Sequence, residues 1–218
     1  MARSSKRSRR GRPAAAPAAS DARRRLLDAA ARRFAAAGFA ATSLRQVAED
    51  AAVTPAMVSY YFRDKHGLLE AVLGEGVELI LAALRGVMTE PSGQGSLLRR
   101  FVEAYLGVLT AHPWIPRIIV QEVISRDTPL RELFVQRFAS QAIALVAPKL
   151  AEEIRAGRLR RDLDPHLTVM SVIGMCVFPY IAEPLLGGLL DYRIDDEFVA
   201  RFAPHTASLL ERGLEVHR

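Results

Sequence analysis

A short stretch of the chain concentrates hydroxyl groups and includes a lysine, and both kinds of side chain suit contacts with a nucleic acid. Tyr60 and Tyr61 are adjacent, and Lys65 follows shortly after them. Phenolic hydroxyls and an ammonium group suit phosphate oxygens, whereas small side chains such as Thr54 and Ser59 would let a helix come close to base edges. The stretch therefore predicts binding to double-stranded DNA, with an ordinary helical hairpin as the alternative.

The elements that must position these residues are predicted by capping signals and helical periodicity. Thr42 or Ser43 can cap a first short helix, and Ser43-x-x-Gln46 has the spacing of a capping box. A turn is predicted at residues 51–53. Thr54 is then expected to cap a second helix, with Pro55 at its first position and Asp64 capping the helix that follows. A helix, a short turn and a helix form the motif that places its second helix in the major groove.

Residues 22–73 resemble the N-terminal domain of TetR/AcrR-type transcriptional regulators. The matching motifs, in family order, are Leu26-Leu27-x-Ala29-Ala30 with Phe34, Gly38-Phe39-x-x-Thr42-Ser43-Leu44, Val47-Ala48, Ala51-x-Val53-Thr54 and Tyr60-Tyr61-Phe62-x-x-Lys65-x-x-Leu68-Leu69. The chain departs from the family pattern where Ala52 replaces a turn Gly, Ala56 replaces a common Gly and Ser59 replaces a common Tyr. The resemblance implies a ligand-responsive DNA-binding regulator, most often a repressor.

The predicted DNA contacts fall into two groups. Contacts with base edges are predicted for Arg45, Thr54, Pro55, Ala56, Met57 and Ser59. Contacts with phosphates are predicted for Thr42, Tyr60, Tyr61 and Lys65, and the resemblance implies the same role for Lys65.

The N-terminal residues 1–19 are predicted to form a disordered basic arm. This arm holds the tetrapeptide Arg10-Gly11-Arg12-Pro13, which looks like the core of an AT-hook. In that interpretation Arg10 and Arg12 read a narrow A/T minor groove, and in the alternative the arm is a plain polybasic segment that adds salt-sensitive affinity. The net charge of +6 and the pI of about 10.0 agree with a polyanionic partner.

Period-two alternation is almost absent and helical periodicity dominates, so the sequence predicts an all-α fold. We predict a helix-turn-helix DNA-binding domain at residues 20–80, with the motif itself at about 43–62, and a C-terminal effector-binding and dimerisation domain at residues 81–218. The predicted helices outside the motif are 20–38, 65–87, a stripe at 97–109, 118–125, 129–157, 166–183 and 195–214.

The predicted helix at residues 166–183 is apolar nearly all round, so it must be buried on more than one side. The family resemblance implies that the last two helices of each subunit pack with those of a second copy in a four-helix bundle. The partner is then a second copy of this chain, and the two recognition helices would read a palindrome with half-sites about 34–36 Å apart.

The resemblance also implies a small-molecule effector that binds between helices of the C-terminal domain, and the aromatic and Met residues there suit an apolar or amphipathic one. Glu122 is the most informative candidate, because a carboxylate flanked by Ile and Val residues must face solvent or find a partner. Plain core packing is the alternative for each candidate. The full set is Phe101, Tyr105, Trp114, Ile118, Gln121, Glu122, Met170, Gly174, Met175 and Phe178.

Several classes of protein are disfavoured. The single cysteine, Cys176, excludes an intrachain disulfide and a Cys-based zinc site, and the histidines lack metal-ligand spacing. Because no nucleotide-binding or nucleophile motif is present, we expect neither an enzyme nor a cofactor. We also expect no apolar run of membrane-spanning length, no signal peptide and a cytoplasmic location. The alternatives to a regulator are an architectural DNA-binding protein of low specificity and a ligand-binding module without specific DNA function.

Overall fold

The computed structural model describes residues 16–89, 95–125 and 129–216. Within these ranges the chain forms helices and one isolated antiparallel bridge between Leu159 and Glu215, which confirms the predicted all-α class. The elements in chain order are α1 (Ala16–Ala41), α2 (Leu44–Asp50), α3 (Pro55–Phe62), α4 (Lys65–Thr89), α5 (Leu97–Ala111), α6 (Trp114–Ile118), the π-helical segment η1 (Ile119–Ile124), α7 (Pro129–Phe134), the π-helical segment η2 (Val135–Ala139), α8 (Ser140–Arg155), α9 (Pro165–Leu186) and α10 (Asp196–Leu214).

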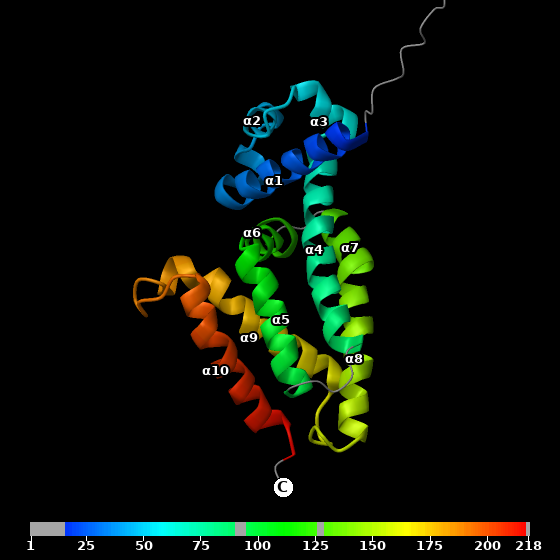
Figure 1. Cartoon of the computed structure of the whole chain (residues 1–218), viewed down its shortest axis with the longest axis vertical. Coiled ribbons are helices and arrows are strands. Elements are labelled where there is room, and N and C mark those ends of the chain that lie inside the picture. Colours follow the sequence, from blue (N-terminus) through cyan, green and yellow to red (C-terminus); the bar gives the residue numbers. More distant parts are fainter. Residues whose placement is uncertain (1–15, 90–94, 126–128, 217–218) are drawn as a thin grey trace, which may run out of the picture.

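Helices α1, α2 and α3 form a head at one end of the molecule (Figure 1). The first helix begins at Ala16 rather than at the predicted Ser20, and it runs to Ala41 rather than ending at Gly38, where φ 80° and ψ 165° interrupt it. These dihedrals suit glycine because it has no Cβ. The buried residues of the head are chiefly Leu26, Leu27, Phe34, Val47, Val58, Phe62 and Leu68.

Helix α4 runs from the head into the rest of the molecule and belongs to both parts (Figure 1). Its first half, through Leu73, packs into the core of the head, and from Ile80 onward it packs into a second core with α5, α8, α9 and α10. The domain boundary that we predicted at residue 80 stays a prediction. The two cores show, however, that one continuous helix joins the head to the C-terminal helices.

Helices α6 and η1 form one continuous segment that lies against the head. The predicted break around residues 112–116 is shorter than expected, because α6 already begins at Trp114. In η1 the backbone N–H groups reach one residue further back than in an α-helix, as when Ser125 N–H donates to the Val120 carbonyl at 3.0 Å. Buried Ile118 and Val123 of this segment belong to the core of the head.

Helix α9 corrects the expectation that no apolar segment reaches membrane-spanning length. It is 22 residues long, and an 18-residue window within it has a mean hydropathy of 1.7. By length and composition alone it could therefore cross a membrane. Helices that are packed in the core of a soluble protein can have the same length and apolar composition. One side of α9 is buried through Val172, Cys176 and Tyr180, whereas large apolar side chains on its other side are exposed.

Candidate nucleic-acid interface and internal cavity

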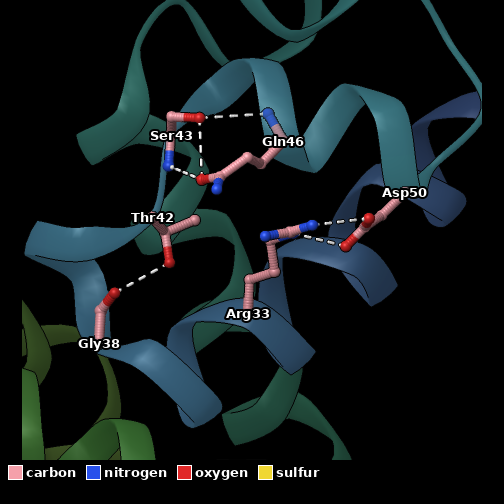
Figure 2. A network of polar contacts seen from close by, with 6 residues as sticks. All are labelled: Arg33, Gly38, Thr42, Ser43, Gln46 and Asp50. Carbon is pink, nitrogen blue, oxygen red and sulfur yellow. Dashed lines mark hydrogen bonds and ion pairs between the residues drawn. The ribbon is translucent and has the colours of Figure 1, made fainter.

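Local hydrogen bonds set the geometry of α2. Ser43 accepts a hydrogen bond from Gln46 N–H at 3.2 Å, and its own N–H donates to Gln46 Oε1 at 2.9 Å, which confirms the predicted capping box (Figure 2). The turn lies where it was predicted, and Ala52 within it has φ 52°. That value lies in the left-handed region, which is costly for a residue with a Cβ.

An ion pair holds α2 against α1. The Arg33 guanidinium donates from Nε to Asp50 Oδ2 at 2.5 Å and from Nη2 to Oδ1 at 2.8 Å (Figure 2). A carboxylate at the C-terminal end of a helix is unfavourable by itself, because that end carries the negative pole of the dipole. Arg33 compensates for it, and its hydrogen bonds lower the pKa of Asp50 below the ordinary value.

Helix α3 presents small side chains to solvent and buries its large apolar ones. Val58 and Phe62 are in the core of the head. The exposed side holds small residues and one large aromatic side chain, Tyr60, which is 81% exposed. The exposed residues of α3 and its N-cap are Thr54, Pro55, Ala56, Ser59 and Tyr60.

Two residues of α3 that we predicted to contact DNA are only half exposed. Met57 and Tyr61 both pack against the core of the head, so neither lies fully on the outer face of α3. Thr54 is the N-cap residue as predicted, but its side chain makes no capping hydrogen bond, which corrects that part of the prediction. The hydroxyl is instead exposed at the start of the helix.

Thr42, which we predicted to contact a phosphate, is buried in this structure. Its side chain is only 3% exposed, and its hydroxyl donates to the Gly38 carbonyl at 2.9 Å (Figure 2). The hydroxyl therefore bonds to the backbone at the interruption of α1. Arg45 is exposed on α2, where it pairs with Glu49 at 3.0 Å. Arg10 and Arg12 lie outside the described residues.

Lys65 lies at the junction of α1 and α4. Its ammonium group donates to the Ala40 carbonyl at 3.3 Å and lies 4.4 Å from the centre of the Phe39 ring. Asp64 caps α4 as predicted, because its Oδ1 accepts from Gly67 N–H at 2.9 Å. This hydrogen bond lowers the pKa of Asp64 below its ordinary value. The cation is thus held at the positive end of a helix, a position that favours a nearby anion.

Glu122 links the C-terminal helices to the head. It lies on η1 with 3% exposure, and its Oε1 accepts from Phe39 N–H at 3.0 Å across 83 residues of sequence. Phe39 follows Gly38, where α1 is interrupted. Glu122 is a predicted ligand contact, and no local signal in the sequence points to its hydrogen bond with Phe39 N–H.

A cavity of about 650 Å³ lies beside η1 among the C-terminal helices. Its wall is formed by the second half of α4, by α5, by α6 with η1, by α7 through α8, and by α9. Every lining residue except Tyr105 and His166 is apolar or glycine. Ile119, Val120 and Ile124 of η1 face this cavity, whereas Ile118 and Val123 face the head.

Only part of the predicted ligand set lines this cavity. Tyr105, Met170 and Gly174 do so. Of the others, Met175 and Phe178 lie at grooves between α9 and α10, and Phe101 on α5 lies beside residues of α4, α8 and α9. The predicted residues that do not line this cavity are Phe101, Trp114, Ile118, Gln121, Glu122, Met175 and Phe178.

Comparisons with known families match both parts of the chain. Residues 26–72 match the family described as bacterial regulatory proteins, tetR family, and residues 96–206 match the tetracyclin repressor-like C-terminal domain. The HTH-type transcriptional regulator YttP of Bacillus subtilis is 31% identical over 50% of this chain and 54% of its own length, so the chain spans about half of that relative.

Two solved structures share the fold across most of the chain. The ketosteroid transcriptional regulator of Mycobacterium tuberculosis has a TM-score of 0.73 and 19% identity, and the match covers 89% of this chain and 95% of that one. The transcriptional regulator FadR of Bacillus subtilis, solved in complex with stearoyl-CoA, has a TM-score of 0.70 and 16% identity, with 89% and 99% covered.

Proposed function

The chain belongs to the tetR family of bacterial regulatory proteins, and from this premise we propose that it is a ligand-responsive transcriptional repressor that binds a palindromic operator as a homodimer. The observation that carries the DNA-reading role is the exposed face of α3, whose small side chains allow close approach to base edges. A DNA partner implies that the protein acts in the cytoplasm.

We assign the DNA contacts by position on the head. Thr54, Pro55, Ala56 and Ser59 on α3 and Arg45 on α2 are exposed and are proposed to meet base edges. The proposed phosphate contacts are Tyr60, Tyr61 and Lys65, because hydroxyl and ammonium groups at the ends of helices suit phosphate oxygens.

The dimer is proposed to form through α9 and α10. The exposed apolar side chains of these helices recur at helical spacing and would otherwise face water. They are Leu167, Met170, Phe178, Ile181 and Leu185 on α9 and Leu209 on α10. A two-fold arrangement of α9 and α10 would bury this surface and set the distance between the two heads.

The effector is proposed to occupy the cavity beside η1. A volume of about 650 Å³ and an apolar wall suit a small apolar molecule. The stearoyl-CoA complex of FadR supports the idea that this fold can hold a long apolar ligand. Because η1 has one face in the cavity and the other in the head, a ligand that moves η1 would shift the head relative to α9 and α10.

The contact assignment is tested by variants of single hydroxyl groups measured on a panel of duplexes. Thr54→Ala and Ser59→Ala should change which base pairs are preferred, because they remove groups at base edges. Tyr60→Phe should weaken binding to all duplexes alike and leave the preference unchanged. The opposite pattern would contradict the division into base and phosphate contacts.

The dimer is tested by light scattering at micromolar concentration. Phe178→Glu places a charge in the middle of the exposed surface of α9 and should give monomers. Val135→Glu changes a residue that is also exposed, at 52%, but lies on η2 away from that surface, and this variant should stay dimeric. Dimeric Phe178→Glu would exclude the proposed interface.

A further inference from the structure

Tyr105 carries the single hydroxyl group among the described residues that line the cavity, whose other polar residue is His166. The residue is 7% exposed, and its ring stacks on Phe101 at 5.8 Å between centroids. Within the part of the chain that the structure describes, no group forms a hydrogen bond with this hydroxyl. Burial raises the pKa of Tyr105 above its ordinary value, so the phenol is neutral at physiological pH. Buried hydroxyl groups of tyrosine usually have a partner.

The remainder of the wall offers nothing that could neutralise a charged ligand. No Lys, Arg, Asp or Glu is among the described lining residues. His166 is the other polar residue, but it is exposed at the start of α9, as are the lining residues Leu167 and Met170 on the same helix. An ionised group brought inside would lose its hydration without gaining a counter-charge.

These two observations define a chemical class. We propose that the effector is an uncharged, mostly apolar molecule with one hydrogen-bonding oxygen, such as an alcohol, ketone or ester, which the Tyr105 hydroxyl recognises. The volume of the cavity equals that of about 20 molecules of liquid water. A ligand with an alkyl chain or ring system of similar volume would fit. Free carboxylates and coenzyme A thioesters are disfavoured. The inference rests on the proposed role of the cavity as the effector site.

Three probes with a chain of the same number of carbon atoms separate the effect of ligand charge from that of apolar surface. These are 1-dodecanol, dodecanoate and dodecanoyl-coenzyme A, which are measured by displacement of the neutral dye Nile red from the purified full chain at pH 8, where the carboxylate is ionised. 1-Dodecanol should bind at least about tenfold more tightly than either anion. Equal or tighter binding of an anion, or no displacement by 1-dodecanol, would overturn the proposal.

Two tyrosine variants test whether Tyr105 recognises the oxygen. Tyr105→Phe should weaken the binding of 1-dodecanol about fivefold, because one hydrogen bond is lost, and should leave the affinity for dodecanoate unchanged. Tyr180→Phe is the matched control. Tyr180 is also buried, but its hydroxyl already pairs with Thr110 at 2.7 Å and it does not line the cavity. Unchanged affinity for 1-dodecanol in Tyr105→Phe, or an equal loss in Tyr180→Phe, would exclude the recognition role.

A parallel selection of bound DNA duplexes separates this inference from the proposed function. If a palindrome is selected but an anionic probe binds best, only the ligand class is wrong. If 1-dodecanol binds as expected and no duplex is enriched, the ligand class stands and the regulator function is wrong.

Discussion

The hydrogen bond between Glu122 and the backbone of Phe39 should control how firmly the head is held. Glu122 lies on the same segment that lines the cavity, and its carboxylate reaches the N–H group that follows the interruption of α1. In Glu122→Ala this N–H group loses its acceptor, and removing one partner of a part-buried hydrogen bond to a charged group costs about 2 kcal/mol.

The loss should appear in the affinity for DNA. The head must then be ordered against η1 before both copies of the chain can bind one duplex. A loss of about 2 kcal/mol in this ordering corresponds to a decrease of up to roughly 30-fold in the affinity for DNA. Glu122→Gln supplies the matched control, because its amide oxygen can still accept from Phe39 N–H. We expect this variant to lose no more than about threefold in affinity.

The assay is fluorescence anisotropy with a selected duplex, accompanied by urea unfolding to verify that each variant is folded. Wild-type affinity in folded Glu122→Ala would refute the idea that this hydrogen bond positions the head. Equal losses of DNA affinity in Glu122→Ala and Glu122→Gln would show that the head is held by the charge of Glu122 rather than by its role as a hydrogen-bond acceptor.

Three further changes test the geometry of the head and its junction with α6. Ala52→Gly should raise the free energy of unfolding by about 1 kcal/mol in urea titrations, because Ala52 has a positive φ of 52°; no gain would mean that the turn carries no strain. Gly76→Ala should lower that free energy by about 1–3 kcal/mol, since a Cβ there would lie 2.9 Å from the Trp114 ring; an unchanged value would mean that the ring moves aside freely. Asp50→Asn removes a carboxylate whose pKa is lowered by Arg33, so the wild type should be the more stable protein at neutral pH and lose this advantage as the pH falls below about 3.9; a difference that persists in acid would exclude the ion pair as its cause.

The sequence predicts those features of the head that depend on neighbouring residues. The capping box of Ser43 and Gln46, the cap at Asp64 and the interruption at Gly38 all involve groups a few residues apart, so their spacing is visible in the chain. The burial of Thr42 could not be predicted from the spacing of neighbouring residues. A hydroxyl before a helix suits a cap, a phosphate or a carbonyl equally, and only the fold shows that it meets the Gly38 carbonyl.

The cavity was harder to predict, because its lining depends on how each helix is rotated about its own axis. Tyr105 lines the cavity, yet Phe101, one turn earlier on the same helix, does not. In η1 the wider turns of a π-helix change this rotation relative to an α-helix, which turns Glu122 toward the head. Because no local pattern specified these turns, the sequence could not assign Glu122 its partner.

Selection of bound duplexes from a random pool by the purified full chain, at near-physiological salt, tests the central claim most directly. A dimer whose heads are fixed by α9 and α10 predicts an enriched palindrome with half-site centres about one helical turn apart. Enrichment of A/T-rich duplexes without symmetry, or no enrichment at all, would contradict the proposal that α3 reads an operator as part of a two-fold dimer.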